Sequence, residues 1–182
     1  MQNSLYFIAL IPPDPLKRQV HDIKLEMKQR YNSSHALNAP PHITLLSPFR
    51  MSDEHQNELD DLLQKLAHEY SPFEVHLKGY SSFPPRVLFI DIESQPKLME
   101  LQSNIEQTAR AHPEIFSYNY SDRPYHPHMT IAFKDLSPSQ FHKAWEHYQD
   151  KDFEARFTTD QLCLLRHDGK NWEVIKAFSF DH

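Results

Sequence analysis

The chain has 182 residues, which suits one domain or two fused half-domains, and 39% of them are hydrophobic, enough for a core. Only 2 residues are Gly, where about 7% is usual. This scarcity excludes the glycine-rich phosphate loops of P-loop and Rossmann nucleotide-binding proteins. The formal charge of −6, from 25 acidic and 19 basic residues, argues against the long basic face that duplex DNA requires.

The single cysteine, Cys163, excludes an internal disulfide and a CxxC zinc site. It lies in the apolar run QLCLLR, so we expect a buried residue in a reducing compartment. The N-terminal segment lacks the basic lead and the apolar length of a signal peptide. No stretch approaches the roughly 20 apolar residues of a membrane span. We therefore expect a cytoplasmic protein with no membrane partner.

Apolar periodicity in the first half of the chain predicts the order strand, helix, strand, helix, strand. These elements are predicted at residues 5–11, 14–30, 42–49, 52–70 and 73–80. Ser52 is the predicted cap of the second helix.

The same order recurs in the second half, with predicted elements at residues 87–92, 96–111, 128–134, 137–148 and 153–158. The remaining segment, 161–180, is predicted to be a hairpin that turns at Asp168 and Gly169. The repeat predicts two similar α+β lobes that face each other across a groove. We expect a single domain over 1–182, with one pseudo-repeat at about 1–82 and another at about 83–182.

Each predicted repeat carries an HxT motif in its second strand, His42 with Thr44 and His128 with Thr130. Alternate residues of a strand share a face, so each strand offers an imidazole and a hydroxyl to one side. If the lobes are related by an approximate two-fold axis, both pairs converge on a volume the size of one phosphate. Opposed histidines can act there as general base and general acid without a metal, while the threonines hold the non-bridging oxygens.

The chain resembles the two-histidine (2H) phosphoesterase superfamily, and within it the bacterial group named after 2′-5′ RNA ligase. The resemblance is carried by the paired motifs HITL and HMTI, the first strand YFIAL, and the segments FEVHLKGYSSFPPRVLFIDI and LCLLRHDGKNWEVIKAFSF. It covers nearly the whole chain. It implies two antiparallel-sheet lobes with helices outside and a central catalytic groove. It also implies catalytic roles for His42 and His128 and phosphate binding by Thr44 and Thr130.

Two further residues are candidates for substrate binding. Tyr125 lies three residues before His128 and could stack on a base or reach the phosphate. Many members of the superfamily carry arginine a few residues beyond the second motif, whereas this chain has Lys134 there. Strand parity places Lys134 on the face of His128, but lysine lacks the bidentate fork of arginine. The aromatic residues Phe7, Phe89 and Phe133 are expected in the core.

The resemblance implies an enzyme that hydrolyses 2′,3′-cyclic phosphates or 2′-5′-linked RNA and nucleotides without a cofactor, or runs the same chemistry backwards as a ligase. We expect a monomer whose partner is a small nucleotide or an RNA terminus. Two alternatives remain. A module that binds nucleotides or RNA ends without turnover is motivated by Lys134. A metal-dependent hydrolase built on His42, His126 and His128 is disfavoured, because no carboxylate stands at a ligand-like spacing beside them.

Overall fold

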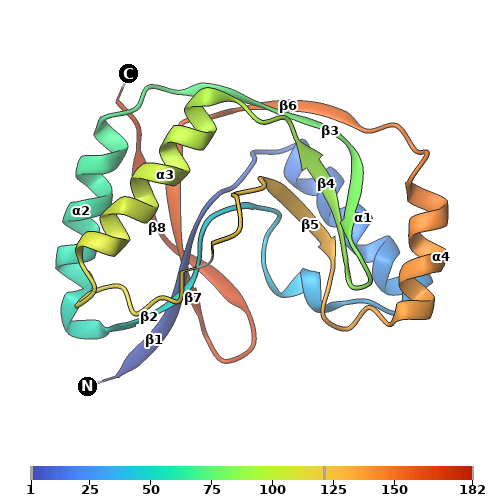
Figure 1. Cartoon of the computed structure of the whole chain (residues 1–182), viewed down its shortest axis with the longest axis horizontal. Coiled ribbons are helices and arrows are strands. Elements are labelled where there is room, and N and C mark those ends of the chain that lie inside the picture. The colour runs from blue at the N-terminus through green and yellow to red at the C-terminus, as the bar shows by residue number, and fades with distance from the viewer. Residues whose placement is uncertain (1, 121, 182) are drawn as a thin grey trace.

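The computed structural model describes residues 2–120 and 122–181, and in these residues the chain forms two four-stranded antiparallel sheets (Figure 1). Sheet A has the order β2-β1-β7-β8, with β1 at Asn3–Leu10, β2 at Ile43–Ser52, β7 at Gln161–His167 and β8 at Trp172–Ser179. Sheet B has the order β5-β4-β3-β6, with β3 at Phe73–Phe83, β4 at Val87–Ile92, β5 at His128–Ala132 and β6 at Glu154–Thr159. The predicted α+β class with two antiparallel-sheet lobes is confirmed.

The helices lie on the outer sides of the two sheets (Figure 1). They are α1 at Leu16–Tyr31, α2 at Gln56–His68, α3 at Pro96–Ala111 and α4 at Pro138–Tyr148. Two short 3₁₀ helices occupy His35–Asn38 and Asp53–His55. Helices α2 and α3 pack beside sheet A, whereas α1 and α4 pack beside sheet B. None of the helices in the described residues is both long and apolar enough to span a membrane.

Strand alternation decides how β1 divides the interior. Tyr6, Ile8 and Leu10 point into the main core beneath the helices. Phe7 and Ala9 point to the opposite face of sheet A, where they join Cys163 and Leu165 of β7 in a second, smaller cluster. Cys163 is 3% exposed, as its apolar setting predicts, and burial raises the pKa of its thiol to about 11.

The two lobes do not coincide with the two halves of the sequence. Strand β3, expected to close the first repeat, pairs with β4 and β6 in sheet B. Strand β7, near the end of the chain, pairs with β1 instead. The helices cross over too, because α1 contacts β5 of sheet B and α3 contacts β2 of sheet A. The turn at 84–86 makes β3 and β4 hairpin neighbours, and short connections favour such antiparallel pairing.

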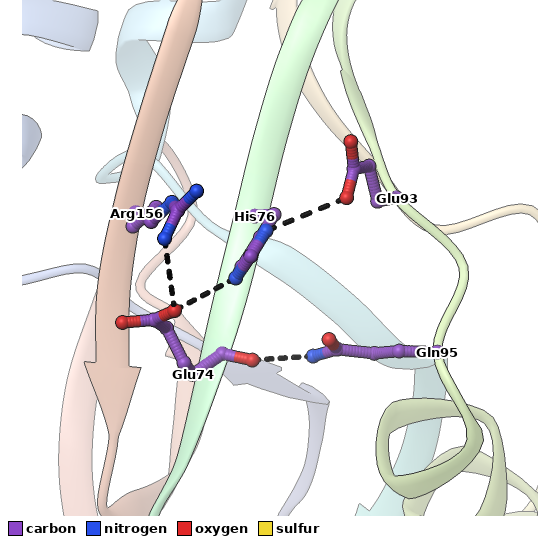
Figure 2. A network of polar contacts seen from close by, with 5 residues as sticks. All are labelled: Glu74, His76, Glu93, Gln95 and Arg156. Atoms are coloured by element: carbon purple, nitrogen blue, oxygen red, sulfur yellow. Dashed lines mark hydrogen bonds and ion pairs between the residues drawn. The ribbon is translucent and has the colours of Figure 1, made fainter.

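One exposed face of β3 is covered by a network of charged and polar side chains (Figure 2). His76 lies 2.7 Å from a carboxylate oxygen of Glu74 and 3.4 Å from one of Glu93. Arg156 of β6 lies 3.7 Å from Glu74, and Gln95 donates to the backbone carbonyl of Glu74. These contacts connect β3 to β6 and to the segment between β4 and α3. His76 therefore takes part in contacts that hold neighbouring segments together.

Candidate active site

A cavity of about 540 Å³ is lined by residues of both sheets and contains both HxT pairs. His42, Thr44, His128 and Thr130 all line it, and all four side chains are half-buried. The structure therefore brings together the four residues that the sequence singled out. The two pairs lie in one cavity although 83 residues stand between Thr44 and His128 in the sequence. The convergence results from the facing positions of sheets A and B.

Each HxT pair stands at the beginning of a strand. Strand β2 begins directly after His42, and β5 begins at His128. In the strand register, Thr44 pairs with Ala9 of β1 and Thr130 pairs with Phe89 of β4. Because residues two apart share a face of a strand, each threonine points to the same side as its histidine.

The two imidazoles are held by the same backbone contact. Nδ1 of His42 lies 2.7 Å from the carbonyl oxygen of Pro40, and Nδ1 of His128 lies 2.7 Å from that of His126. A carbonyl oxygen only accepts, so in both rings Nδ1–H is the donor. This contact leaves Nε2 of each ring as the nitrogen that can take up or release a proton at the cavity.

A phenylalanine from the neighbouring strand packs against each imidazole. The ring centroids of Phe7 and His42 are 4.8 Å apart, and those of Phe89 and His128 are 5.0 Å apart. Phe7 is 3% exposed and Phe89 is fully buried, as expected of core residues. Trp172 packs on Phe7 at 4.6 Å, which completes an aromatic support on the sheet A side. These contacts restrict the histidine rings to one orientation.

Burial lowers the pKa values of both histidines. The pKa of His42 falls to about 4, chiefly through burial and also through the positive charge of Lys24, against the raising effect of the Pro40 carbonyl. Burial also lowers the pKa of His128, against the raising effect of the hydrogen bond to His126. Both imidazoles are therefore neutral at pH 7 in the free protein.

Lys24 is a cavity residue that the sequence reasoning missed. It lies on the buried stripe of α1 and is 2% exposed, and its Nζ donates to the carbonyl oxygens of Ala36 and Ala39 at 2.9 and 3.0 Å. Burial lowers its pKa to about 7. A signal was present in the sequence, because a lysine four residues after Val20 interrupts an apolar helical stripe.

Lys134 also lines the cavity, but not for the reason that strand parity suggested. Strand β5 ends at Ala132, and Lys134 adopts a left-handed backbone conformation with a φ of 63°. The neighbouring Asp135 accepts hydrogen bonds from the Ser33 hydroxyl and from the backbone amides of Ser34 and His35. These bonds hold the turn after β5 against the segment before the first 3₁₀ helix.

Tyr125 is not among the residues that line the cavity. Its hydroxyl donates to the backbone carbonyl of Thr44 at 2.7 Å, and burial raises its pKa. The expected contact between Tyr125 and substrate is therefore not supported by its position. His126 does not line the cavity either, and its Nε2 lies 3.0 Å from a carboxylate oxygen of Asp91.

No group of three or more His, Cys, Asp and Glu side chains in residues 2–120 and 122–181 is arranged to hold a metal ion. The polar side chains that line the cavity carry imidazole, hydroxyl, amide and ammonium groups.

Comparison with known proteins places this fold and site in a family. The model of the 2′-5′ RNA ligase superfamily matches residues 12–171, so the chain belongs to that superfamily, the 2H phosphoesterases. A Geobacillus kaustophilus protein named "Putative phosphoesterase" is 27% identical over 177 residues, covering 95% of this chain and 94% of its own. A Bacillus mycoides protein of the same name is 30% identical over 164 residues, covering 88% and 90%.

Solved structures of E. coli LigT share the fold. LigT complexed with 3′-AMP superimposes with a TM-score of 0.70 at 19% identity, and LigT complexed with ATP with a TM-score of 0.71 at 16% identity. Each comparison covers 100% of both chains. Membership of the superfamily supports a phosphoesterase activity for this chain.

Proposed function

We propose that the protein is a metal-independent phosphodiesterase that acts on 2′,3′-cyclic phosphates or 2′-5′ linkages of RNA and nucleotides. The observation that carries this proposal is the pair of imidazoles in one cavity, each anchored through Nδ1 to a carbonyl 2.7 Å away and each accompanied by a threonine. The arrangement leaves two Nε2 atoms and two hydroxyls for one phosphate.

In the proposed reaction, neutral Nε2 of one histidine takes the proton of the attacking water as the new O–P bond forms. The other histidine, protonated, donates its Nε2 proton to the departing 2′ or 3′ oxygen as that P–O bond breaks. The negative charge of a bound phosphodiester raises the pKa of a neighbouring imidazole and so favours the protonated acid. The hydroxyls of Thr44 and Thr130 donate to the non-bridging oxygens, where negative charge increases in the transition state. When the 5′-hydroxyl of a second RNA replaces water as the nucleophile and the 3′ oxygen departs with the donated proton, the same step gives 2′-5′ ligation.

Two observations support a nucleotide substrate. The cavity combines aromatic side chains, including Phe7, Phe83 and Trp172, with polar and basic ones, which suits a base together with a ribose and a phosphate. The related LigT has been solved with 3′-AMP, ATP and NADP⁺ bound.

The experiment incubates the protein with 2′,3′-cyclic mononucleotides and with 2′-5′- and 3′-5′-linked dinucleotides in excess EDTA. We expect turnover of the cyclic or the 2′-5′ compounds, and analysis of the product identifies the bond that breaks. Mixing an RNA 2′,3′-cyclic end with a 5′-hydroxyl end tests ligation. The absence of turnover for every cyclic and 2′-5′ compound would contradict the proposal.

The position of Lys134 favours one second candidate, a nucleotide-binding module without turnover. Lysine at the cavity supplies charge but not the two parallel hydrogen bonds that arginine gives a phosphate. Calorimetric binding of a nucleoside monophosphate with no product from any diester would favour this candidate over the enzyme.

A further inference from the structure

Lys24 is a buried cation in the wall of the cavity that contains both HxT pairs. It belongs to α1, which contacts β5 of sheet B, yet its ammonium group reaches the segment that leads into β2 of sheet A. The carbonyl oxygens of Ala36 and Ala39 accept two of its three N–H hydrogens. Within residues 2–120 and 122–181, the third hydrogen has no acceptor.

The charge of Lys24 also lacks a counter-ion in the described part of the chain. It forms no ion pair there, and no Asp or Glu is among the described residues that line the cavity. Two carbonyl dipoles offset only part of the free energy needed to remove an ammonium group from water. The lowered pKa of Lys24, about 7, reflects this imbalance, because burial lowers it and no carboxylate raises it. A bound anion would supply the missing charge.

The ammonium group lies within electrostatic reach of the first histidine, because its charge lowers the pKa of His42. The two side chains also depend on the same short segment. Ala36 and Ala39 accept from Lys24, and the next carbonyl, that of Pro40, accepts from Nδ1 of His42. An anion bound beside His42 therefore lies close enough to Lys24 to interact with its charge.

The cavity has a second lysine, Lys134, but its surroundings differ. Lys134 is exposed, whereas Lys24 is 2% exposed. Water solvates an exposed ammonium group and screens its attraction to an anion, so such a charge contributes little to binding. A buried ammonium group acts in a medium of lower dielectric constant, where its hydrogen bonds are stronger. Of the two lysines, Lys24 is therefore the stronger ligand for an anion.

We propose that Lys24 is the cation that binds the substrate phosphate, and that its third N–H donates to a non-bridging oxygen of the phosphate between His42 and His128. This inference rests on the proposed function and adds one charged donor to the hydroxyls of Thr44 and Thr130. The hydrogen bond strengthens as negative charge increases on the non-bridging oxygens in the transition state. Lys24 thus touches the reacting group and is a catalytic residue of the proposed reaction.

The first test observes Lys24 in the unaltered protein by NMR titration of ¹³C-labelled lysine side chains. Without ligand, the Lys24 resonance should titrate near pH 7, while exposed lysines titrate at about 10.4. Saturating adenosine 2′-monophosphate should raise the Lys24 midpoint by about one unit or more, since a neighbouring anion favours the charged form. Adenosine, which lacks the phosphate, should leave the midpoint unchanged. A Lys24 resonance that ignores the monophosphate would overturn the inference.

The second test compares the affinity for adenosine 2′-monophosphate in wild type and three variants by calorimetry. Lys24→Met should bind about tenfold or more weakly, the loss expected for one hydrogen bond between charged groups. Lys134→Met should lose about fivefold or less, as an exposed charge does. Lys28→Met is the matched control, because Lys28 is an exposed residue of the same helix outside the cavity, and its affinity should be unchanged.

Wild-type affinity in Lys24→Met, or a larger loss in Lys134→Met, would refute the assignment of the phosphate to Lys24. If Lys24→Met does not fold, the NMR titration of the unaltered protein decides. Both tests measure binding and do not depend on turnover. A Lys24 midpoint that moves in a protein without diesterase activity supports the inference and contradicts the proposed enzymatic function. Turnover with an unresponsive Lys24 supports the function and contradicts the inference.

Discussion

The hydroxyl of Tyr125 donates a 2.7 Å hydrogen bond to the backbone carbonyl of Thr44, so the segment before β5 is tied to the beginning of β2. The bond links the second HxT motif to the first through a group that does not line the cavity. Tyr125 is thus placed as a positioning residue for Thr44.

Replacing Tyr125 with Phe removes this bond and leaves the carbonyl of Thr44 without its donor. We expect the free energy of unfolding to fall by about 1 kcal/mol. We also expect kcat for a cyclic phosphate to fall while KM changes little. The reason is that a displaced Thr44 hydroxyl weakens a hydrogen bond that matters mainly in the transition state. Denaturant unfolding and steady-state kinetics measure the two effects, with Tyr118→Phe as the control. Unchanged kcat in a folded Tyr125→Phe protein would contradict the positioning role.

Replacing either histidine of the proposed mechanism, His42 or His128, with Ala should lower kcat/KM by about 10² to 10⁴, the usual contribution of one general acid or base. The double variant His42→Ala/His128→Ala should be little worse than either single variant, since the two proton transfers belong to one step. His142→Ala, an exposed residue of α4, serves as the control and should leave the rate unchanged. Activity retained in the double variant would remove both histidines from the mechanism.

Lys24→Met tests the electrostatic part of the His42 environment. Removing the ammonium should raise the pKa of His42, yet leave it below 6.5, because burial is the larger cause of the shift. An NMR titration of the imidazole resonances measures the change. Lys28→Met, an exposed position on the same helix, should leave the pKa unchanged. An unaltered His42 titration in the Lys24 variant would show that the two charges do not interact.

Binding of a phosphate ligand at pH 7 should be coupled to proton uptake. The pKa values of both histidines are lowered in the free protein, so neither ring is charged at pH 7, and an anion beside them raises those values. Calorimetry with a nucleoside 2′-monophosphate in buffers of different ionisation enthalpy measures the protons taken up. We expect uptake that falls in His42→Ala/His128→Ala, and the uptake that remains comes from Lys24, whose pKa of about 7 is also raised by a bound anion. Binding heats that are independent of the buffer would be inconsistent with this assignment.

The pH dependence of kcat/KM should be bell-shaped with its maximum on the acidic side of pH 6.5. This parameter reports the free enzyme, in which burial lowers the pKa of both the acid and the base. The apparent values belong to the pair of histidines. The maximum of kcat should lie at higher pH, because bound substrate raises the pKa of the acid. A kcat/KM that rises steadily to pH 9 would exclude a protonated histidine from the rate-determining step.

The sequence predicts local features of this molecule well. Apolar periodicity locates the helices and strands, and the duplicated HxT pattern selects the four polar residues that meet in the cavity. Both signals depend on neighbours in the chain, since the period of a helix or strand decides which residues share a face.

Pairing between distant strands is not visible in such patterns. The periodicity of 73–83 shows a strand but not that its partners are β4 and β6. The predicted substrate contact of Tyr125 is not supported for the same reason, because its hydroxyl donates to the carbonyl of Thr44, 81 residues away in the sequence. Helical periodicity could have indicated that Lys24 is buried. It could not indicate that the carbonyls of Ala36 and Ala39 accept hydrogen bonds from its ammonium group, because only the fold brings these groups together.

The exchange of strands between the lobes has a consequence for synthesis of the chain. During translation, β1 and the first HxT motif leave the ribosome early, but the strand that completes the sheet beside β1 is β7, at Gln161–His167. The nascent chain therefore lacks the strand beside β1 until residues 161–167 have been made, so the cavity that contains both HxT pairs is complete only when nearly the whole chain has been synthesised.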